Sequence, residues 1–323
     1  MTYNLDENWI ANDINSIPDF IIGGSMKSGT TTLHQILAGH PNVFIPEKEI
    51  RFFDTDNILQ HPNFHSFNPK NQKWSDTIQG NELKKAWKWY QNLYEDQKTM
   101  LKGEDSTSYL ASEIAADRIS RQNKKIKLIF LLRQPTLRAY SQYYHMLRRD
   151  SAMWSFEDTL KFNPYSVLYR SLYKTQLEYY YSLFPEDQIK VILFEDLIKN
   201  PKCVIKDLSI FLNLDYAQFP DEIFDMHANK AKLPRFPRLQ LHKNKIIGNL
   251  SPRYINKSQS KSKQLITEKV FEKFFNRINP KINKKAPRIN PSTKEYLDKF
   301  FYRELNGIDE LTGLNIMKRW FDK

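Results

Sequence analysis

A short stretch near the N-terminus combines the residue types that bind a phosphate. Residues 20–22 are apolar and predict a buried strand, which runs into Gly-Gly-Ser-Met-Lys-Ser-Gly-Thr-Thr-Thr at 23–32. A small-residue loop between a strand and a helix presents backbone N–H groups and a helix N-terminus to an anion. Lys27 adds a mobile positive charge, and the flanking candidates are Ser28, Gly29, Thr30, Thr31 and Thr32.

The position of the lysine separates this loop from the standard nucleotide-triphosphate loop. In that motif the lysine follows the last glycine, whereas here Lys27 precedes Gly29. The sequence also lacks a clear apolar strand that ends in a magnesium-binding Asp. Both observations argue against a kinase or NTPase, which remains the alternative with an atypical phosphate loop.

A second candidate segment reads Pro-Glu-Lys-Glu-Ile-Arg-Phe-Phe-Asp at 46–54. One helix and one short strand separate it from the phosphate loop, so the chain is expected to return beside that loop. A carboxylate there is suited to act as a general base on a hydroxyl group. Phe52 and Phe53 are expected in the core.

A third candidate segment contains Arg133 and Ser141. The apolar run 127–132 predicts a strand that ends before Arg133, and Pro135 is typical of a helix start. Along a helix, this spacing places Arg133 and Ser141 near one face. A guanidinium and a hydroxyl together suit a phosphate monoester. Arg138, in the same segment, either is structural or joins the same phosphate-binding network, and we favour the structural role.

These segments resemble the sulfotransferases that use 3′-phosphoadenosine-5′-phosphosulfate (PAPS). Lys-Ser-Gly-Thr-Thr at 27–31 resembles their 5′-phosphosulfate loop. Lys-Glu-x-x-Phe-Phe at 48–53 resembles heparan-sulfate-type polysaccharide sulfotransferases and their bacterial relatives. L-R-x-P-x-x-R-A-x-S-x-Y at 132–143 resembles the segment that binds the 3′-phosphate, and weaker matches lie at 103–110 and 229–235.

The resemblance implies a role for each candidate residue. Glu49 falls on the catalytic base, and Lys27 would stabilise charge on the bridging oxygen. Residues 27–32 would hold the 5′-phosphate, and Arg133 with Ser141 the 3′-phosphate. Several family members have histidine where this chain has Arg51, which implies a different acceptor contact there. The remaining implied contacts are Arg235 for the cofactor, and Lys48, Arg51 and Tyr109 for the acceptor.

The pattern of elements predicts an α/β fold. Short apolar strands alternate with amphipathic helices, which argues for a parallel sheet with crossover helices. The resemblance implies a P-loop NTPase-like sheet flanked by helices. We predict one domain, 1–323, with a basic loop and helix insertion at about 230–290. Predicted strands are 20–22, 42–45, 127–132 and 190–194; predicted helices are 31–38, 81–94, 111–121, 135–149, 172–183, 202–212, 265–277 and 291–305.

The charge is concentrated in one part of the chain. The 323 residues carry a net charge of +12, yet residues 230–288 alone hold 17 Lys or Arg against two Glu. This basic stretch is either a solvated insertion or a surface that attracts a polyanion. It fits an anionic glycan, and equally a membrane surface that carries a lipid-linked acceptor. A nucleic-acid binder is a third reading, but no aromatic-interleaved recognition motif supports it.

Composition narrows the remaining classes. The single cysteine excludes an intramolecular disulfide, and the seven histidines show no metal-ligand spacing, so no metal is expected. No secretory signal and no apolar run of ~20 residues is visible. We therefore expect a cytoplasmic protein with at most peripheral membrane contact. Few glycines and many Lys, Asn and Ile suggest an AT-rich bacterial genome.

The predicted function is transfer of a sulfuryl group from PAPS to a hydroxyl of a glycan or glycoconjugate, directly and in line, leaving 3′-phosphoadenosine-5′-phosphate (PAP). A lipid or a small-molecule alcohol is the alternative acceptor.

Overall fold

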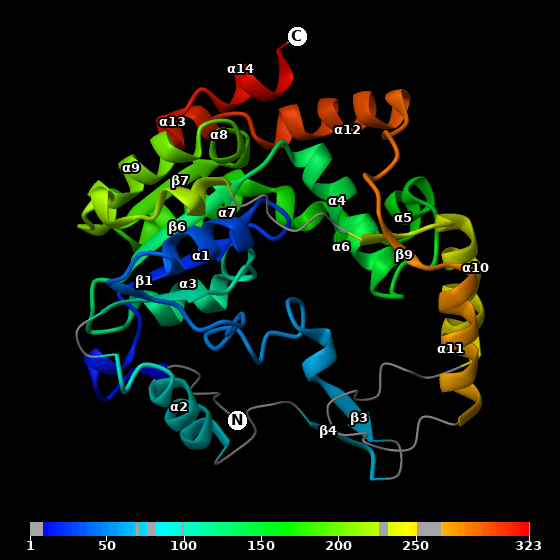
Figure 1. Cartoon of the computed structure of the whole chain (residues 1–323), viewed down its shortest axis with the longest axis horizontal. Helices are drawn as coiled ribbons and strands as arrows, with labels where there is room; N and C mark the ends of the chain where they lie inside the picture. The colour runs from blue at the N-terminus through cyan, green and yellow to red at the C-terminus, as the bar shows by residue number, and fades with distance from the viewer. Residues whose placement is uncertain are drawn as a thin grey trace.

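The centre of the molecule is a five-stranded parallel sheet with the order β2-β5-β1-β6-β7 (Figure 1). The structure is a computed structural model that describes residues 9–68, 71–75, 82–97, 100–225, 232–250 and 266–322. Every neighbouring pair of strands in this sheet runs parallel, as the sequence predicts. The strands are β1 (Phe20–Gly24), β2 (Val43–Phe44), β5 (Leu101–Asp105), β6 (Lys127–Leu132) and β7 (Ile189–Leu193).

Helices cover both faces of the sheet because its central strands are apolar on both sides. In β1, Ile21 packs into one hydrophobic cluster, whereas Phe20 and Ile22 pack into the other. Alternate residues of a strand point to opposite faces, so the two clusters lie on opposite faces of the sheet. One cluster takes side chains from α1 (Thr30–Ala38) and α9 (Pro201–Leu212). The other takes side chains from α2, α3 and α7.

The helices predicted from the sequence are confirmed, with ends that differ by two residues or fewer. Besides α1 and α9, they are α2 (Glu82–Asn92), α3 (Glu113–Ser120), α4 (Pro135–Arg148), α7 (Tyr173–Leu183), α11 (Ile266–Ile278) and α12 (Pro291–Glu304). The sequence did not predict α5 (Phe156–Phe162), α6 (Tyr165–Leu168), α8 (Phe194–Lys199), α13 (Ile308–Thr312), α14 (Ile316–Phe321), or the hairpin of β3 (Ser66–Asn68) and β4 (Lys73–Ser75).

Strand β5 is not among the strands predicted from the sequence, and the structure adds it. Its residues Leu-Lys-Gly-Glu-Asp are mostly charged or small, so no apolar pattern marks it. Gly103 is required because a Cβ there would lie 2.3 Å from the ring of Phe20. The strand ends in Asp105, but it is not a clear apolar strand of the kind whose absence argues against a kinase or NTPase. Asp105 is buried and lies 3.2 Å from His34 Nδ1.

The basic stretch contains more regular structure than the sequence predicts. Residues 237–250, expected as loop, form helix α10 (Pro237–Leu250), and β8 (Lys232–Pro234) pairs antiparallel with β9 (Lys281–Asn283). With α11 they lie to one side of the sheet (Figure 1). Buried polar contacts help to hold helix α10 in place. For example, Asn244 is buried and donates to Ala152 O at 2.7 Å. That explains why hydrophobic periodicity did not reveal the helix.

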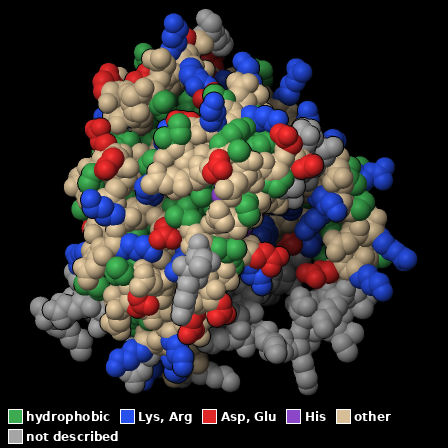
Figure 2. Space-filling view, turned by 60° about the vertical axis from the view of Figure 1, so that its left-hand side comes forward, with side chains coloured by type: hydrophobic (Ala, Val, Ile, Leu, Met, Phe, Trp, Pro, Cys, Tyr) green, Lys and Arg blue, Asp and Glu red, His purple; other side chains and the backbone are tan. Residues whose placement is uncertain are grey.

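Charge is mixed over the face of the molecule shown in Figure 2, where acidic and basic side chains alternate. By contrast, the described part of the basic stretch carries ten exposed cations: Lys232, Arg235, Arg238, Lys245, Lys273, Arg277, Lys281, Lys284, Lys285 and Arg288. Within the described ranges, no helix is long and apolar enough to cross a membrane. That all 323 residues form one domain stays a prediction.

The stability of the central sheet provides a first test. Leu131 in β6 is fully buried, so Leu131→Ala removes contacts and leaves a cavity. We expect the free energy of unfolding to fall by about 2–5 kcal/mol in urea denaturation. The matched control is Ile210→Ala on α9, where the side chain is 73% exposed and the change should stay within about 0.5 kcal/mol. Equal losses in both variants would contradict the assignment of β6 to the core.

Candidate active site

The predicted site residues gather at the carboxyl edge of the sheet. Strand β1 lies between β5 and β6, and the loops that follow these three strands meet at one edge. In open α/β sheets, ligands bind outside the carboxyl ends of strands where the connections diverge to opposite sides. The phosphate loop follows β1, the segment with Glu49 lies against the end of β5, and Arg133 follows β6.

The phosphate loop, residues 25–29, is fixed to the neighbouring strand and to itself. Ser25 N donates to Leu131 O at 2.8 Å, and the hydroxyls of Ser25 and Ser28 lie 2.6 Å apart. Lys27 has φ 74° and Gly29 has φ 91°, both in the left-handed region. Such alternation turns successive N–H groups toward one side and forms a concave anion site. A Cβ at residue 29 would lie 2.7 Å from the ring of Phe194, which also requires glycine.

Helix α1 begins directly after this loop and adds donors to it. Gly29 is its N-cap and supplies no side-chain cap, so the first N–H groups of the helix lack a partner within it. Thr30 and Thr32 are buried, and Thr31 is exposed. The structure therefore brings together all six predicted residues from 27 to 32 in one strand–loop–helix unit.

Arg133 lies against the phosphate loop from the side of β6. Its Nη1 donates to Lys27 O at 3.2 Å, and its guanidinium lies 4.8 Å from the ring centroid of Phe194. Tyr173 OH donates to Arg133 O at 2.9 Å and fixes the backbone there. Ser141 lies on α4 and is partly exposed. Of the predicted pair, Arg133 thus lies beside the phosphate loop and Ser141 lies farther along α4.

The structure confirms that Arg138 has a structural role. The side chain is completely buried, and it donates to Ser171 Oγ and Val167 O.

Glu49 is held by contacts from two sides. Arg51 donates from Nε to Glu49 Oε2 at 2.9 Å and also from Nη2, which forms an ion pair. Thr107 Oγ1 donates to the other oxygen, Oε1, at 3.3 Å. The backbone is fixed by the loop after β5, because Arg51 N donates to Ser106 Oγ at 2.7 Å. Strand β5, which the sequence did not reveal, therefore positions the candidate base.

The electrostatics of the site centre on Lys27. Burial lowers the pKa of its amine from 10.5 to about 8, and the positive charges of Arg148 and Arg133 add to this effect. Glu49 acts in the opposite direction and raises that pKa. The candidate base is therefore close enough to Lys27 to influence its charge.

Several residues at the site were not found from the sequence. Arg170 is partly buried and donates to Gln60 Oε1 at 2.8 Å and to Met26 Sδ at 3.0 Å, which places it against the phosphate loop. Arg148 and Arg149 end helix α4. The only signal for these arginines in the sequence is their charge, which many exposed residues share.

Three of the predicted contact residues are placed differently from those described above: Tyr109, Lys48 and Arg235. Tyr109 is completely buried, and its hydroxyl accepts a hydrogen bond from Phe53 N at 2.9 Å. This burial does not agree with the expected contact between Tyr109 and an acceptor. Tyr109 is instead a core residue. Phe52 and Phe53 are also buried, which confirms their predicted place in the core. Lys48 is exposed beside Glu49.

Arg235 lies on the exposed side of the basic stretch. Its N–H donates to Pro280 O at 3.0 Å, and its guanidinium lies 5.4 Å from the ring centroid of Phe236. The part of its predicted loop at 229–231 lies outside the described residues.

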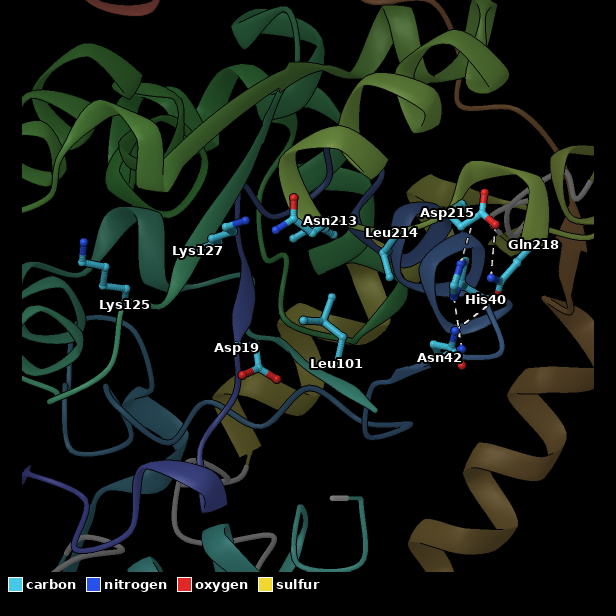
Figure 3. Close-up of a pocket in the computed structure, with 11 residues that line it drawn as sticks. Asp19, His40, Asn42, Leu101, Lys125, Lys127, Asn213, Leu214, Asp215 and Gln218 are labelled. Atoms are coloured by element: carbon cyan, nitrogen blue, oxygen red, sulfur yellow. Dashed lines mark hydrogen bonds between the residues drawn. The ribbon is translucent and has the colours of Figure 1, made fainter. Parts of the chain in front are cut away.

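A cavity of about 640 Å³ lies at the opposite edge of the sheet (Figure 3). It is lined by Asp19, Leu101 and Lys127, which precede or begin strands, and by the hydrogen-bonded group of His40, Asn42, Asp215 and Gln218. None of the predicted site residues lines it. It is therefore separate from the site at the carboxyl edge.

Comparisons with known proteins show which family the sequence matches. A sequence model described as the sulfotransferase family matches residues 18–218. Mouse heparan sulfate glucosamine 3-O-sulfotransferase 5 is 29% identical over 216 residues, which are 62% of this chain and 55% of the relative. Human bifunctional heparan sulfate N-deacetylase/N-sulfotransferase 2 is 24% identical over 214 residues, or 61% of this chain and 22% of that protein. The chain thus spans less than two thirds of either relative.

The chain is also similar in fold to a solved structure. A sulfotransferase from Alicyclobacillus acidocaldarius matches with a TM-score of 0.59 at 21% identity, covering 94% of this chain and 99% of that one. The family match spans the phosphate loop, Glu49, Arg133 and Ser141, and ends before Arg235. On the extent of this match, the chain belongs to the sulfotransferase family.

Proposed function

We propose that this protein transfers a sulfuryl group from PAPS to a hydroxyl of a glycan or glycoconjugate. The observation that carries the proposal is the placement of a base and two cations around one phosphate loop. Glu49, Lys27 and Arg133 come from three separate segments, and the sheet brings them to one edge. The glycan acceptor is supported by the relatives, whose names refer to heparan sulfate.

The donor set fits a nucleotide that carries phosphate groups at both ends. The phosphate loop offers N–H groups, hydroxyls and the Lys27 ammonium, a set of donors suited to a 5′-phosphosulfate. Arg133 and Ser141 offer a guanidinium and a hydroxyl for the 3′-phosphate. Arg235 is proposed as a further cofactor contact. PAPS supplies an activated sulfuryl group when it is bound.

Glu49 is proposed as the general base. Arg51 donates two N–H groups to Oε2, whereas Oε1 accepts one hydrogen bond from Thr107 at 3.3 Å, so Oε1 is proposed as the oxygen that takes the acceptor's proton. Thr107 orients the carboxylate. Arg51 and exposed Lys48 flank Glu49 in the sequence, and both are proposed as acceptor contacts.

Lys27 is proposed to neutralise the negative charge that develops on the bridging oxygen of the donor. The ammonium must be protonated to do so. Since its pKa is about 8, the group is partly neutral just above that pH until an anion binds. A bound dianion favours the protonated form and raises the pKa again.

The ten exposed cations of the basic stretch fit an anionic partner. A cytoplasmic location and a bacterial source stay predictions from the sequence.

The cofactor is tested first by calorimetric titration of the protein with PAP. We expect micromolar binding of PAP and much weaker binding of ATP with magnesium. Arg133→Ala should abolish this preference, because it removes the charge proposed for the 3′-phosphate. Absence of PAP binding, or a preference for ATP with magnesium, would refute the proposed sulfotransferase and favour the alternative, a kinase or NTPase.

The base is tested by Glu49→Gln, with Glu47→Gln as the matched control. Glu47 is exposed two residues earlier. Transfer of labelled sulfuryl groups from PAPS is measured on whichever oligosaccharide of an acceptor panel the wild type modifies. Glu49→Gln should leave PAP affinity intact and lower turnover by ~10²-fold or more. Wild-type turnover in this variant would remove Glu49 as the base.

The protonation state of Lys27 is tested by labelling with an acylating reagent at increasing pH. Only the neutral amine reacts, so half-maximal labelling of Lys27 is expected near pH 8 in the folded protein. In denatured protein the midpoint should move toward 10.5. Arg148→Ala should also raise it, because a repelling charge is removed. A folded-state midpoint near 10.5 would show that Lys27 is not desolvated.

A further inference from the structure

A buried carboxyl group that the proposed mechanism does not use lies beside the segment with the candidate base. Glu104, in strand β5, is completely buried. Its partner in register on the central strand β1 is Ile21. A carboxyl group withdrawn from water must be hydrogen-bonded or paired, so its partners show what it does.

Two hydroxyl groups donate to the carboxyl group of Glu104. Ser106 Oγ donates to Oε1 at 2.7 Å, and Tyr90 OH, from α2, donates to Oε2. Ser106 and Tyr90 are themselves completely buried, so bulk water does not compete for these bonds. The single hydrogen of the Ser106 hydroxyl is therefore committed to Glu104.

The Ser106 hydroxyl also holds the backbone of Arg51. Donation to Glu104 leaves the lone pairs of Ser106 Oγ free, and Arg51 N–H donates to this oxygen at 2.7 Å. Arg51 has φ 55°, in the left-handed region that residues other than glycine seldom adopt. Such a conformation persists only where surrounding contacts maintain it, and the bond to Ser106 is one of these contacts.

The backbone conformation of Arg51 decides where its side chain meets Glu49. Arg51 Nε donates to Glu49 Oε2 at 2.9 Å, and Nη2 donates to the same oxygen. Because the two residues are only two positions apart, a rotation of the backbone between them would move the guanidinium relative to the carboxylate. Thr107, which follows Ser106, donates to the other oxygen at 3.3 Å. The loop after β5 thus acts on both oxygens of the candidate base.

We propose that Ser106, oriented by the buried carboxyl group of Glu104, is a positioning residue for sulfuryl transfer that acts on Glu49 through Arg51. This inference rests on the proposed function, in which Glu49 is the base. Neither Ser106 nor Glu104 takes part in the chemistry. Together they fix the hydrogen bond that keeps the segment with the base in its left-handed turn.

The role is tested first by Ser106→Ala, with Ser108→Ala as the matched control. Ser108 is buried in the same loop, but its hydroxyl lies 3.4 Å from His61 Nε2 and not on the segment with the base. Turnover is measured with saturating PAPS and the oligosaccharide that the wild type modifies. Ser106→Ala should lower kcat about tenfold or more with PAP affinity unchanged, because the base is misplaced. Ser108→Ala should keep wild-type kcat.

The part played by Glu104 is tested by a double-mutant cycle. Because Ser106 and Tyr90 donate to different oxygens of Glu104, one of them faces an NH2 donor in Glu104→Gln and loses its acceptor. We expect Glu104→Gln to lower kcat in the wild-type background and to have no further effect in Ser106→Ala. Additive losses would show that Glu104 does not act through Ser106.

The pH profile supplies a second readout, because Glu104 changes its charge near neutral pH. Burial raises the pKa of its carboxyl group from 4.5 to about 7; the surrounding hydroxyl groups lower this pKa, and Asp54 raises it further. The other titratable groups that face Glu104 are Tyr90, Tyr94 and Tyr109, which stay neutral because burial raises the pKa of each well above 10. The carboxylate form accepts from both hydroxyls, so kcat of the wild type should rise as the pH passes about 7. This rise should be absent in Glu104→Gln.

Hydrogen exchange at the Arg51 amide needs neither PAPS nor an acceptor. Ser106→Ala should accelerate this exchange about tenfold or more, because the N–H loses its partner, and Ser108→Ala should leave it unchanged. Wild-type turnover and wild-type exchange in Ser106→Ala would overturn the positioning role, as would equal losses in the two serine variants. Failure of the wild type to bind PAP is distinguishable, because it refutes the proposed function while the exchange still decides whether Ser106 holds Arg51.

Discussion

The site depends on the parallel pairing of β1 with β5 and β6. This pairing fixes the register of three strands whose following loops carry the phosphate cradle, the anchors of Glu49, and Arg133. The bond from Ser25 N to Leu131 O continues the pairing of β1 and β6 into the loop itself. A slip in register would separate these groups, since none of them is adjacent in the chain.

Close packing constrains both the interior of the sheet and the loop at its carboxyl edge. Gly103 admits the ring of Phe20, and Gly29 admits the ring of Phe194. Phe194 lies in turn under the guanidinium of Arg133. The glycine of the phosphate loop and the arginine beside it are thus positioned by one aromatic ring. Interiors at this density resist even a single added methyl group.

The electrostatic character of the site follows from burial together with an imbalance of charge. Lys27, Arg133 and Arg148 are all partly withdrawn from water, and burial lowers the pKa of each. Glu49, a carboxylate that acts on Lys27, is already paired with Arg51. Such a site stabilises incoming negative charge without reorganisation, which is how fixed dipoles and charges contribute to group transfer.

The sequence by itself determined the phosphate loop, the central apolar strands, most helices and the candidate base. Each has a local signature, such as the order Lys-Ser-Gly-Thr or the apolar run at 127–132. Tertiary structure alone decided strand β5, helix α10 and the roles of the buried arginines. Their stability comes from contacts with distant residues, such as Gly103 with Phe20 or Asn244 with Ala152, which leave no periodic pattern. Likewise, only the fold shows that Tyr109 is buried and that Arg148 reaches the surroundings of Lys27, because both depend on where separate segments meet in space.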